Sequence, residues 1–238
     1  MKSNSQSRLA VIPARGGSKR IPKKNIKPFV GKPVLEYAIK NAIASEIFDE
    51  IVVSTDSEEI AEFAVKCGAK IPYMRNKELS GDFVGTDSVV MDVINTFKSK
   101  SVQFDFIAGI YPTTPFLEPT DLVNGLTKMI QAKSDFLLTV CKLRFPLERI
   151  YVNSHDGLIS PSDKRFYLER SQDLPEYFFD AGQFSWGTRK GWENVSSNGI
   201  ISCSYLELPW NKSIDLDNLS DWHMAEQIYQ SMINTIEN

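Results

Sequence analysis

The stretch Leu9-Ala-Val-Ile-Pro-Ala-Arg-Gly-Gly-Ser-Lys-Arg-Ile-Pro-Lys-Lys-Asn25 decides the fold class of this chain. Its first part, residues 9–14, is apolar throughout, which predicts a strand buried on both faces, as in a parallel sheet. The loop that follows holds two glycines and five cations with no acid among them. In open α/β sheets, ligands bind beyond the carboxyl ends of the strands, so this loop is the first place to expect a binding site.

Working outward from this stretch, short apolar runs alternate with amphipathic ones. Further strands are predicted over 51–53, 106–110 and 136–140, and helices over 33–45, 58–67, 89–97 and 119–132. Ser57 is expected to cap the second helix and Gly68 to close it. This alternation predicts an α/β fold with a doubly wound, mostly parallel sheet. The chain ends with a strand-like run (200–206), an acidic turn (214–217) and a helix (220–236).

We interpret residues 1–238 as a single domain. The proline- and aromatic-bearing residues at about 144–187 are predicted to form an insert that carries substrate contacts or a subunit interface. With 238 residues, 42% of them hydrophobic, the chain can build a large core without disulfide or metal staples. A homodimer or a higher homo-oligomer is the expected assembly.

Charge and composition exclude several classes of function. The net charge of −3 argues against general nucleic-acid binding, which usually shows a basic excess. The three cysteines lie far apart and form no metal-binding or disulfide pattern, and two histidines are too few for a histidine-rich metal site. The apolar runs are too short for a signal peptide or a membrane span, so we expect a cytoplasmic protein without a membrane partner.

The loop after the first strand is interpreted as a phosphate-binding loop. Gly16 and Gly17 allow the backbone to turn and present N–H groups, and the surrounding cations can neutralise phosphates. The loop matches neither the P-loop nor the dinucleotide fingerprint. An isolated basic run is more often a solvated surface loop, but here it stands at the ligand end of the predicted sheet in an acidic chain. We therefore favour phosphate binding.

Asp215 and Asp217, near the end of the chain, form a candidate magnesium site. In extended backbone, side chains two residues apart face the same side, so both carboxylates can reach one cation. Mg²⁺ prefers such oxygen ligands and completes its shell with water and phosphate. The alternative is a loop whose acids cap the last helix. We favour Mg²⁺ as the cofactor because the chain also carries the phosphate-binding loop.

The stretch from Ala10 to Asn25 resembles the nucleotide-binding signature of the acylneuraminate cytidylyltransferases, which join CTP to acidic eight- or nine-carbon sugars. The resemblance continues with Gly31-Lys-Pro33, Val53-Ser-Thr-Asp56, Tyr111-Pro-Thr-Thr-Pro115 and the acidic pair, and so covers roughly residues 8–220. It implies a fold like that of the nucleotide-diphospho-sugar transferases. It also implies that the partners of the chain are CTP and an acidic nonulosonic sugar.

The residues and the resemblance together give three sets of expected site residues. The catalytic set consists of Arg15, Lys24, Asp215 and Asp217, the last two holding the metal. The nucleotide-binding set consists of Arg15, Gly16, Gly17, Ser18, Lys19, Asn25, Asp56, Arg75 and Ser88. The sugar-binding set consists of Tyr111, Thr113, Thr114, Arg170, Asp180, Gln183 and Phe184. No histidine is an evident base, so we expect the metal or a carboxylate to assist deprotonation of the sugar hydroxyl.

Two departures from the family pattern bear on which sugar is bound. The sialic-acid enzymes typically carry Gln-Pro-Thr-Ser-Pro-Leu-Arg after the central strand, where this chain has Tyr111 and Phe116-Leu117. The segment Phe179-Asp-Ala-Gly-Gln-Phe184 looks like that of the branch that uses pseudaminic acid. The alternatives are N-acetylneuraminic or legionaminic acid as substrate and, more distantly, a metal-dependent glycosyltransferase or a nucleotide-sensing module.

Overall fold

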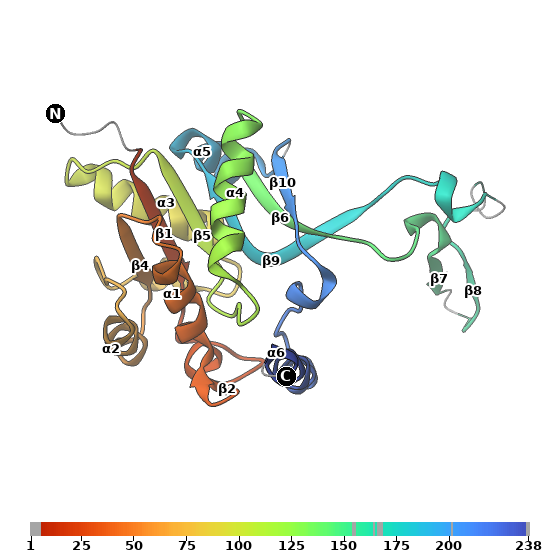
Figure 1. Ribbon diagram of the computed structural model, residues 1–238, viewed down its shortest axis with the longest axis horizontal. Helices are drawn as coiled ribbons and strands as arrows, with labels where there is room; N and C mark the ends of the chain where they lie inside the picture. The colour runs from red at the N-terminus through yellow and green to blue at the C-terminus, as the bar shows by residue number, and fades with distance from the viewer. Residues whose placement is uncertain (1–5, 154–155, 164, 166–168, 201, 237–238) are drawn as a thin grey trace.

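A computed structural model describes residues 6–153, 156–163, 165, 169–200 and 202–236. The centre of the molecule is a six-stranded sheet in the order β10-β6-β9-β5-β1-β4 (Figure 1). The strands are, in that order, β10 (Ser204–Glu207), β6 (Phe136–Lys142), β9 (Phe178–Gly187), β5 (Phe106–Ile110), β1 (Arg8–Pro13) and β4 (Glu50–Ser54). β1 pairs in parallel with β4 and β5, and β10 with β6, whereas β9 runs antiparallel between β5 and β6. The mostly parallel sheet is therefore confirmed.

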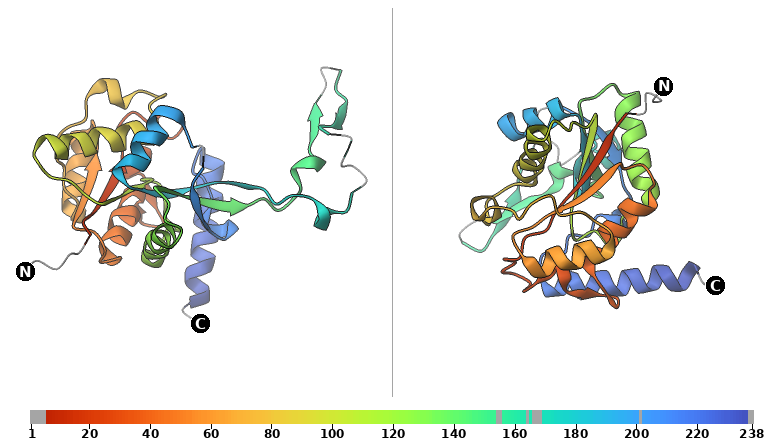
Figure 2. Two further views of the ribbon diagram at one scale, coloured as in Figure 1. Left: turned by 90° about the horizontal axis from the view of Figure 1, so that it is seen from above. Right: turned by 90° about the vertical axis from the view of Figure 1, so that its left-hand side faces the viewer.

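Helices cover both faces of the sheet, as a doubly wound fold requires (Figure 2). α1 (Val34–Ala44), α2 (Glu58–Cys67) and α4 (Pro119–Gln131) share one core with the side chains on one face of β1, such as Ile12. α3 (Thr86–Ser99) and α5 (Arg189–Asn198) share a second core with the opposite side chains, such as Val11. Neighbouring residues of β1 thus serve different cores, because successive strand side chains point to opposite faces.

The helix-end signals acted as predicted around α2. Ser57 Oγ accepts a hydrogen bond from the Ile60 N–H at 3.5 Å, and Gly68 closes the helix with φ of 106°, a left-handed conformation that suits glycine. α3 starts at Thr86 rather than at Val89, because the polar residues before its apolar face form its first turn. β10 covers 204–207 rather than the 200–206 predicted; residue 201 lies outside the described residues.

The predicted insert at about 144–187 is shorter in the structure. Its last part, Phe178–Gly187, is β9, which pairs with β5 through Ile107↔Gly187 and with β6 through Phe136↔Gly187. The mixed polar and aromatic pattern hid this strand, because polar residues such as Gln183 and Ser185 are buried in it beside Trp186, whereas the aromatic Phe178 and Phe179 at its outer end are exposed.

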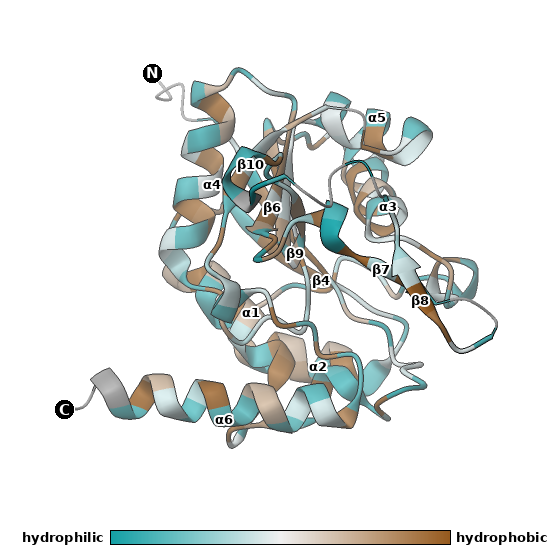
Figure 3. Ribbon diagram, turned by 90° about the vertical axis from the view of Figure 1, so that its right-hand side faces the viewer, coloured by the Kyte–Doolittle hydropathy of each residue, from teal (hydrophilic) through white to brown (hydrophobic). Residues whose placement is uncertain are grey.

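The described residues between 143 and 177 form an arm that projects from the main body (Figures 1 and 2). β7 (Tyr151–Asn153) and β8 (Ile159–Pro161) pair antiparallel within it. Large apolar side chains are exposed there, among them Val152 at 53% and Ile159 at 66%. Figure 3 shows this apolar character in the brown ribbon of β8.

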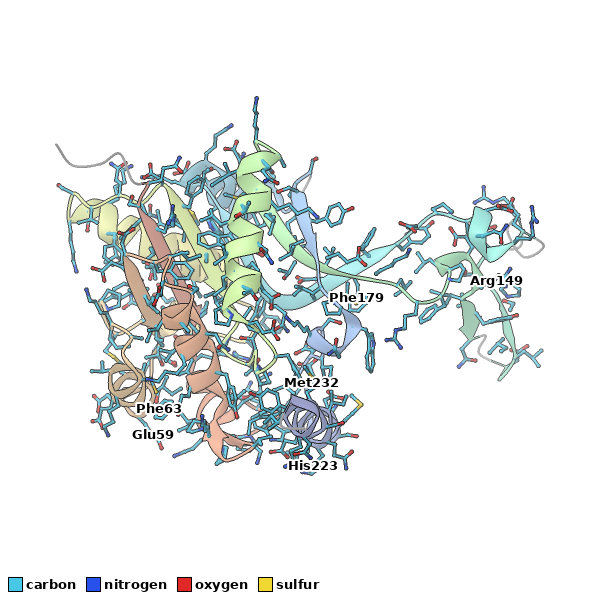
Figure 4. The ribbon with its side chains drawn as sticks, viewed as in Figure 1. Glu59, Phe63, Arg149, Phe179, His223 and Met232 are labelled. Atoms are coloured by element: carbon cyan, nitrogen blue, oxygen red, sulfur yellow. The ribbon has the colours of Figure 1, made fainter. Side chains whose placement is uncertain are left out.

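The last helix packs beside the binding end of the sheet. α6 (Leu219–Ile236) shares a third core with α1 and with the short hairpin of β2 (Pro28–Phe29) and β3 (Lys32–Pro33). Ile214 and Leu216, just before α6, are buried in this core. His223 of α6 is exposed (Figure 4). Every helix in the described part of the chain is too short or too polar to span a bilayer.

Candidate active site

A cavity of about 510 Å³ opens beyond the carboxyl ends of β1 and β5. The loop after β1, the loop before α3, the loop after β5 and the segment before α6 all contribute to its wall. The lining residues are Pro13, Arg15, Ser18, Lys19, Arg20, Lys24, Asn25, Arg75, Leu79, Gly81, Asp82, Val84, Gly85, Thr86, Val89, Tyr111, Pro112, Thr113, Asp215 and Asp217. Segments far apart in sequence therefore meet where parallel-sheet topology predicts a ligand.

Internal hydrogen bonds hold the loop after β1 in place. Asp56 Oδ1 accepts from the Gly16 N–H at 2.8 Å, and the buried Asn25 donates from Nδ2 to the Arg15 carbonyl at 2.9 Å. A Cβ on Gly16 would lie 3.0 Å from the Ser57 Cβ, so glycine permits a close approach of two loops here. Neither Gly16 nor Gly17 has a positive φ. Asp56 and Asn25 thus shape the loop, and Asp56 is not among the residues that line the cavity.

Two cations of the loop share an anion that the sequence did not reveal. Asp82 accepts from Arg15 at 2.7 Å through Oδ1 and from Lys19 at 2.5 Å through Oδ2. These two hydrogen bonds hold the pKa of Asp82 below its usual range. Asp82 lies in the cavity wall, in an irregular segment without hydrophobic periodicity, so nothing in the sequence marked it. Its carboxylate therefore occupies a position at which phosphate oxygens could bind the same two cations.

Lys24 lies beside the acidic pair in the cavity wall. Lys24 Nζ donates to the Leu216 carbonyl at 2.8 Å, between Asp215 and Asp217 in the chain. Arg20 forms an ion pair with Asp217 at 2.6 Å. Ile214 and Leu216 are buried while Asp215 and Asp217 line the cavity, so the predicted alternation of side chains holds.

The charges in this corner perturb one another. Burial lowers the pKa of Lys24, although the nearby carboxylates of Asp215 and Asp217 oppose the shift. Burial raises the pKa of Asp215, and repulsion from Asp217 adds to the effect, which Lys24 and Arg20 reduce. A divalent cation would relieve the repulsion between the two carboxylates.

The donor set suits Mg²⁺ rather than a metal held by protein ligands alone. Among the described residues, no three histidine, cysteine or carboxylate side chains gather as a metal cage. Mg²⁺ commonly binds through one or two carboxylates and completes its shell with water and substrate phosphates. Two carboxylates on one side of an extended segment, beside a cluster of cations in the same cavity, fit that pattern.

Arg75 and Tyr111 line other parts of the cavity wall. Arg75 is only 6% exposed, its N–H donates to the Thr55 carbonyl at 2.8 Å, and burial lowers the pKa of its guanidinium. Its Nε is buried and has no hydrogen-bond partner among the described residues. Burial also raises the pKa of Tyr111, whose hydroxyl contacts Thr86.

Several predicted residues do not reach the cavity wall. Phe184 and Thr114 are 0% exposed and Gln183 is 1% exposed. Phe184 packs in the core with α4, and Thr114 donates to the Tyr111 carbonyl at 3.0 Å. Ser88 donates to Asp87 at 3.3 Å on α3 and is absent from the wall. Phe184, Gln183 and Thr114 thus expose almost no surface in this structure, and their contacts with the sugar stay a prediction.

Asp180 and Arg170, both predicted to bind the sugar, are not among the residues that line the cavity, and they lie at different distances from it. Asp180 of β9 lies close enough to Asp215 for that negative charge to add to the effect of burial, which raises the pKa of Asp180. Arg170 lies on the arm, where it pairs with Asp173 at 3.1 Å. The backbone carbonyl of its neighbour Glu169 accepts from the Arg149 guanidinium at 2.7 Å, and Figure 4 shows Arg149 far from the main body.

The fold and the site define a nucleotidyl-transfer enzyme, and residues 9–177 match the cytidylyltransferase family. The chain belongs to this family. It is 40% identical over 222 residues to the pseudaminic acid cytidylyltransferase of Campylobacter jejuni, covering 93% of this chain and 96% of that protein. It is 31% identical to the CMP-N,N'-diacetyllegionaminic acid synthase of Legionella pneumophila, over 93% of this chain and 96% of that one.

Solved structures with low sequence identity share the fold. A CMP:2-keto-3-deoxy-manno-octonic acid synthetase complexed with CTP has a TM-score of 0.71 at 18% identity and covers 95% of this chain and 99% of that one. A 4-diphosphocytidyl-2C-methyl-D-erythritol synthase from Anaerococcus prevotii has a TM-score of 0.59 at 15% identity, with coverage of 95% and 100%. The α/β fold with a mostly parallel sheet is thus shared with other cytidylyltransferases.

Proposed function

We propose that the chain transfers CMP from CTP to the anomeric hydroxyl of pseudaminic acid and releases pyrophosphate. The observation that carries this proposal is the meeting of Arg15, Lys19 and Lys24 with Asp215 and Asp217 in one cavity. A triphosphate needs the cations, and phosphoryl chemistry commonly needs a metal held by carboxylates. The 40% identity to the Campylobacter jejuni enzyme supports the choice of sugar.

In the proposed reaction, the sugar oxygen attacks the α-phosphorus of CTP and the bond to the β-phosphate oxygen breaks. Negative charge develops on the phosphate oxygens, so catalysis depends mainly on positioning and on positive charge. Arg15 and Lys24 bind and orient the triphosphate, with Lys19 and Arg20 in support. Arg75, which lines the same wall, is proposed to contact the nucleotide.

Mg²⁺ is the proposed cofactor, with Asp215 and Asp217 as its protein ligands. When bound, it supplies Lewis-acid stabilisation of phosphate charge. Asp217→Asn tests the assignment, because an amide oxygen is a poorer ligand for Mg²⁺ than a carboxylate. Pyrophosphate release by this variant should be lost at limiting Mg²⁺. Wild-type activity at limiting Mg²⁺ would show that Asp217 is not a ligand.

The sugar specificity is tested by competition. Purified protein receives CTP, Mg²⁺ and equal concentrations of pseudaminic, N-acetylneuraminic and N,N'-diacetyllegionaminic acid, and the CMP-sugars are separated by mass. We expect CMP-pseudaminic acid to dominate, since the apolar ring of Tyr111 suits a methyl end better than a glycerol tail. Dominance of another product would reassign the sugar, and absence of pyrophosphate with all three would refute the function.

The arm is proposed to join two copies of the chain. Its exposed apolar side chains, including Phe145 at 58% and Leu158 at 65%, favour burial against another molecule. Arg170 could then reach a sugar only from the arm of a partner, since it lies away from the cavity of its own chain. Sedimentation of the intact protein tests the dimer.

We place the reaction in the cytoplasm, where CTP is made and where the free cysteines of the chain remain reduced.

A further inference from the structure

A buried lysine outside the cavity joins two segments that adjoin its wall. Lys212 is 8% exposed, and its Nζ lies 2.8 Å from Glu118 Oε2 and 2.8 Å from Asp121 Oδ2. Asp121 is itself 8% exposed. Such a buried ammonium group is retained only where nearby acceptors compensate for its lost hydration. The three side chains form what we call the Lys212 cluster.

On one side, the Lys212 cluster fixes the start of α4. Glu118 and Asp121 form a reciprocal capping box there, and Asp121 Oδ2 also accepts from the Glu118 N–H at 2.9 Å. The loop 111–117, which carries Tyr111 and Thr113 into the cavity, ends at this cap. Movement of the cap would therefore move the end of the loop.

On its other side, the cluster fixes the segment that carries the acidic pair. Lys212 ends a 3-10 helical turn (Trp210–Lys212), three positions before Asp215. Downstream, the Asp217 N–H donates to Asp221 Oδ2 at 3.2 Å, at the start of α6. The segment 213–217 is thus held at both ends, and the buried Ile214 and Leu216 hold its middle.

We propose that Lys212 is a positioning residue that sets the placement of Asp215 and Asp217 relative to the Tyr111 loop. An ion cluster suits this role, because two hydrogen bonds from one ammonium group fix its position, whereas an apolar side chain would only fill space. The inference rests on the proposed function, since it assumes that the acidic pair holds the metal. Lys212 touches no reacting atom.

The test uses Lys212→Met and the double variant Lys212→Met/Asp121→Asn in the full-length protein. The double variant removes the unpaired buried carboxylate, so lost stability and lost positioning can be separated. Lys190→Met is the matched control. It removes a 2.6 Å lysine–aspartate ion pair with Asp135 at the start of α5, away from the cavity wall. All variants are first checked for cooperative thermal unfolding.

Two readouts address the proposal. Binding of Mn²⁺ in the presence of CTP, followed by the electron paramagnetic resonance of the free ion, should weaken about tenfold or more in both Lys212 variants and stay unchanged in Lys190→Met. Hydrogen exchange should accelerate in peptides covering 111–117 and 213–217 together. Wild-type Mn²⁺ affinity in both variants, or faster exchange confined to 210–212, would overturn the proposal.

Failure of the proposed function gives a different result. If Asp217→Asn binds Mn²⁺ with CTP as tightly as the wild type, the metal assignment is wrong. The exchange measurement then still decides whether Lys212 couples the two segments. Coupled acceleration of 111–117 and 213–217 supports the positioning role, and independent behaviour refutes it.

Discussion

Replacing Lys24 by methionine should lower kcat/KM for CTP by about a hundredfold. The side chain is half-buried and held by the Leu216 carbonyl at 2.8 Å, so it is a preorganised cation rather than a mobile surface charge. A unit charge about 4 Å from a phosphate oxygen contributes about 4 kcal/mol at an effective dielectric constant of about 20. When Lys24 binds phosphate, it gives up part of its attraction to the acidic pair. The variant should therefore lose about 3 kcal/mol of transition-state stabilisation, the usual loss for one preorganised donor.

Lys23→Met is the matched control, because the two lysines are adjacent and have the same chemistry. Lys23 Nζ pairs with Glu59 Oε2 at 2.7 Å on the outer surface and does not line the cavity. Pyrophosphate release at saturating sugar and Mg²⁺ should change less than about twofold in this variant, since exposed pairs contribute little. Equal losses in the two variants, or kcat/KM within about threefold of wild type for Lys24→Met, would refute the assignment of Lys24 to the triphosphate.

Three further outcomes are expected. Asp82→Asn should lower KM for CTP in steady-state assays, because the triphosphate no longer competes with this carboxylate for Arg15 and Lys19; a raised KM would show that Asp82 instead orients the cations. Mixing the impaired Arg170→Ala and Lys24→Met variants should restore about a quarter of wild-type activity if the arm acts across a symmetric dimer, and no recovery would show that Arg170 does not act at the partner's site. Gly125→Ala should lower the free energy of unfolding by about 1–3 kcal/mol in urea titrations, since its Cβ would lie 2.7 Å from the Phe184 ring; an unchanged midpoint would mean that the core relaxes around it.

Sequence reasoning found the parts of the site that local patterns specify. The apolar run before Arg15 fixed the place of the cationic loop, and the alternation around Asp215 fixed which side chains face the cavity. Both depend on strand periodicity, which is readable residue by residue.

The missed parts depend on long-range contacts. Asp82 joins the site through ion pairs to residues more than sixty positions earlier in the chain, and the intervening sequence does not specify them. Phe184 was assigned to the sugar because its segment mixes polar and aromatic residues and resembles a family motif, but such a mixture also occurs in a strand that enters the core. Only the pairing of β9 with both β5 and β6 distinguishes the two.

That pairing has a consequence for how the protein can be rebuilt or diversified. β6 and β9 run from the arm into the middle of the sheet without interruption (Figure 1). Deleting the whole of 144–187 would remove a central strand and leave β5 without its neighbour on that side. Grafts of arms from relatives should therefore be joined at residues 143 and 177, outside the sheet. Between those two residues the arm can be replaced by the arm of a relative, whereas β9 must be kept because it is a central strand of the sheet.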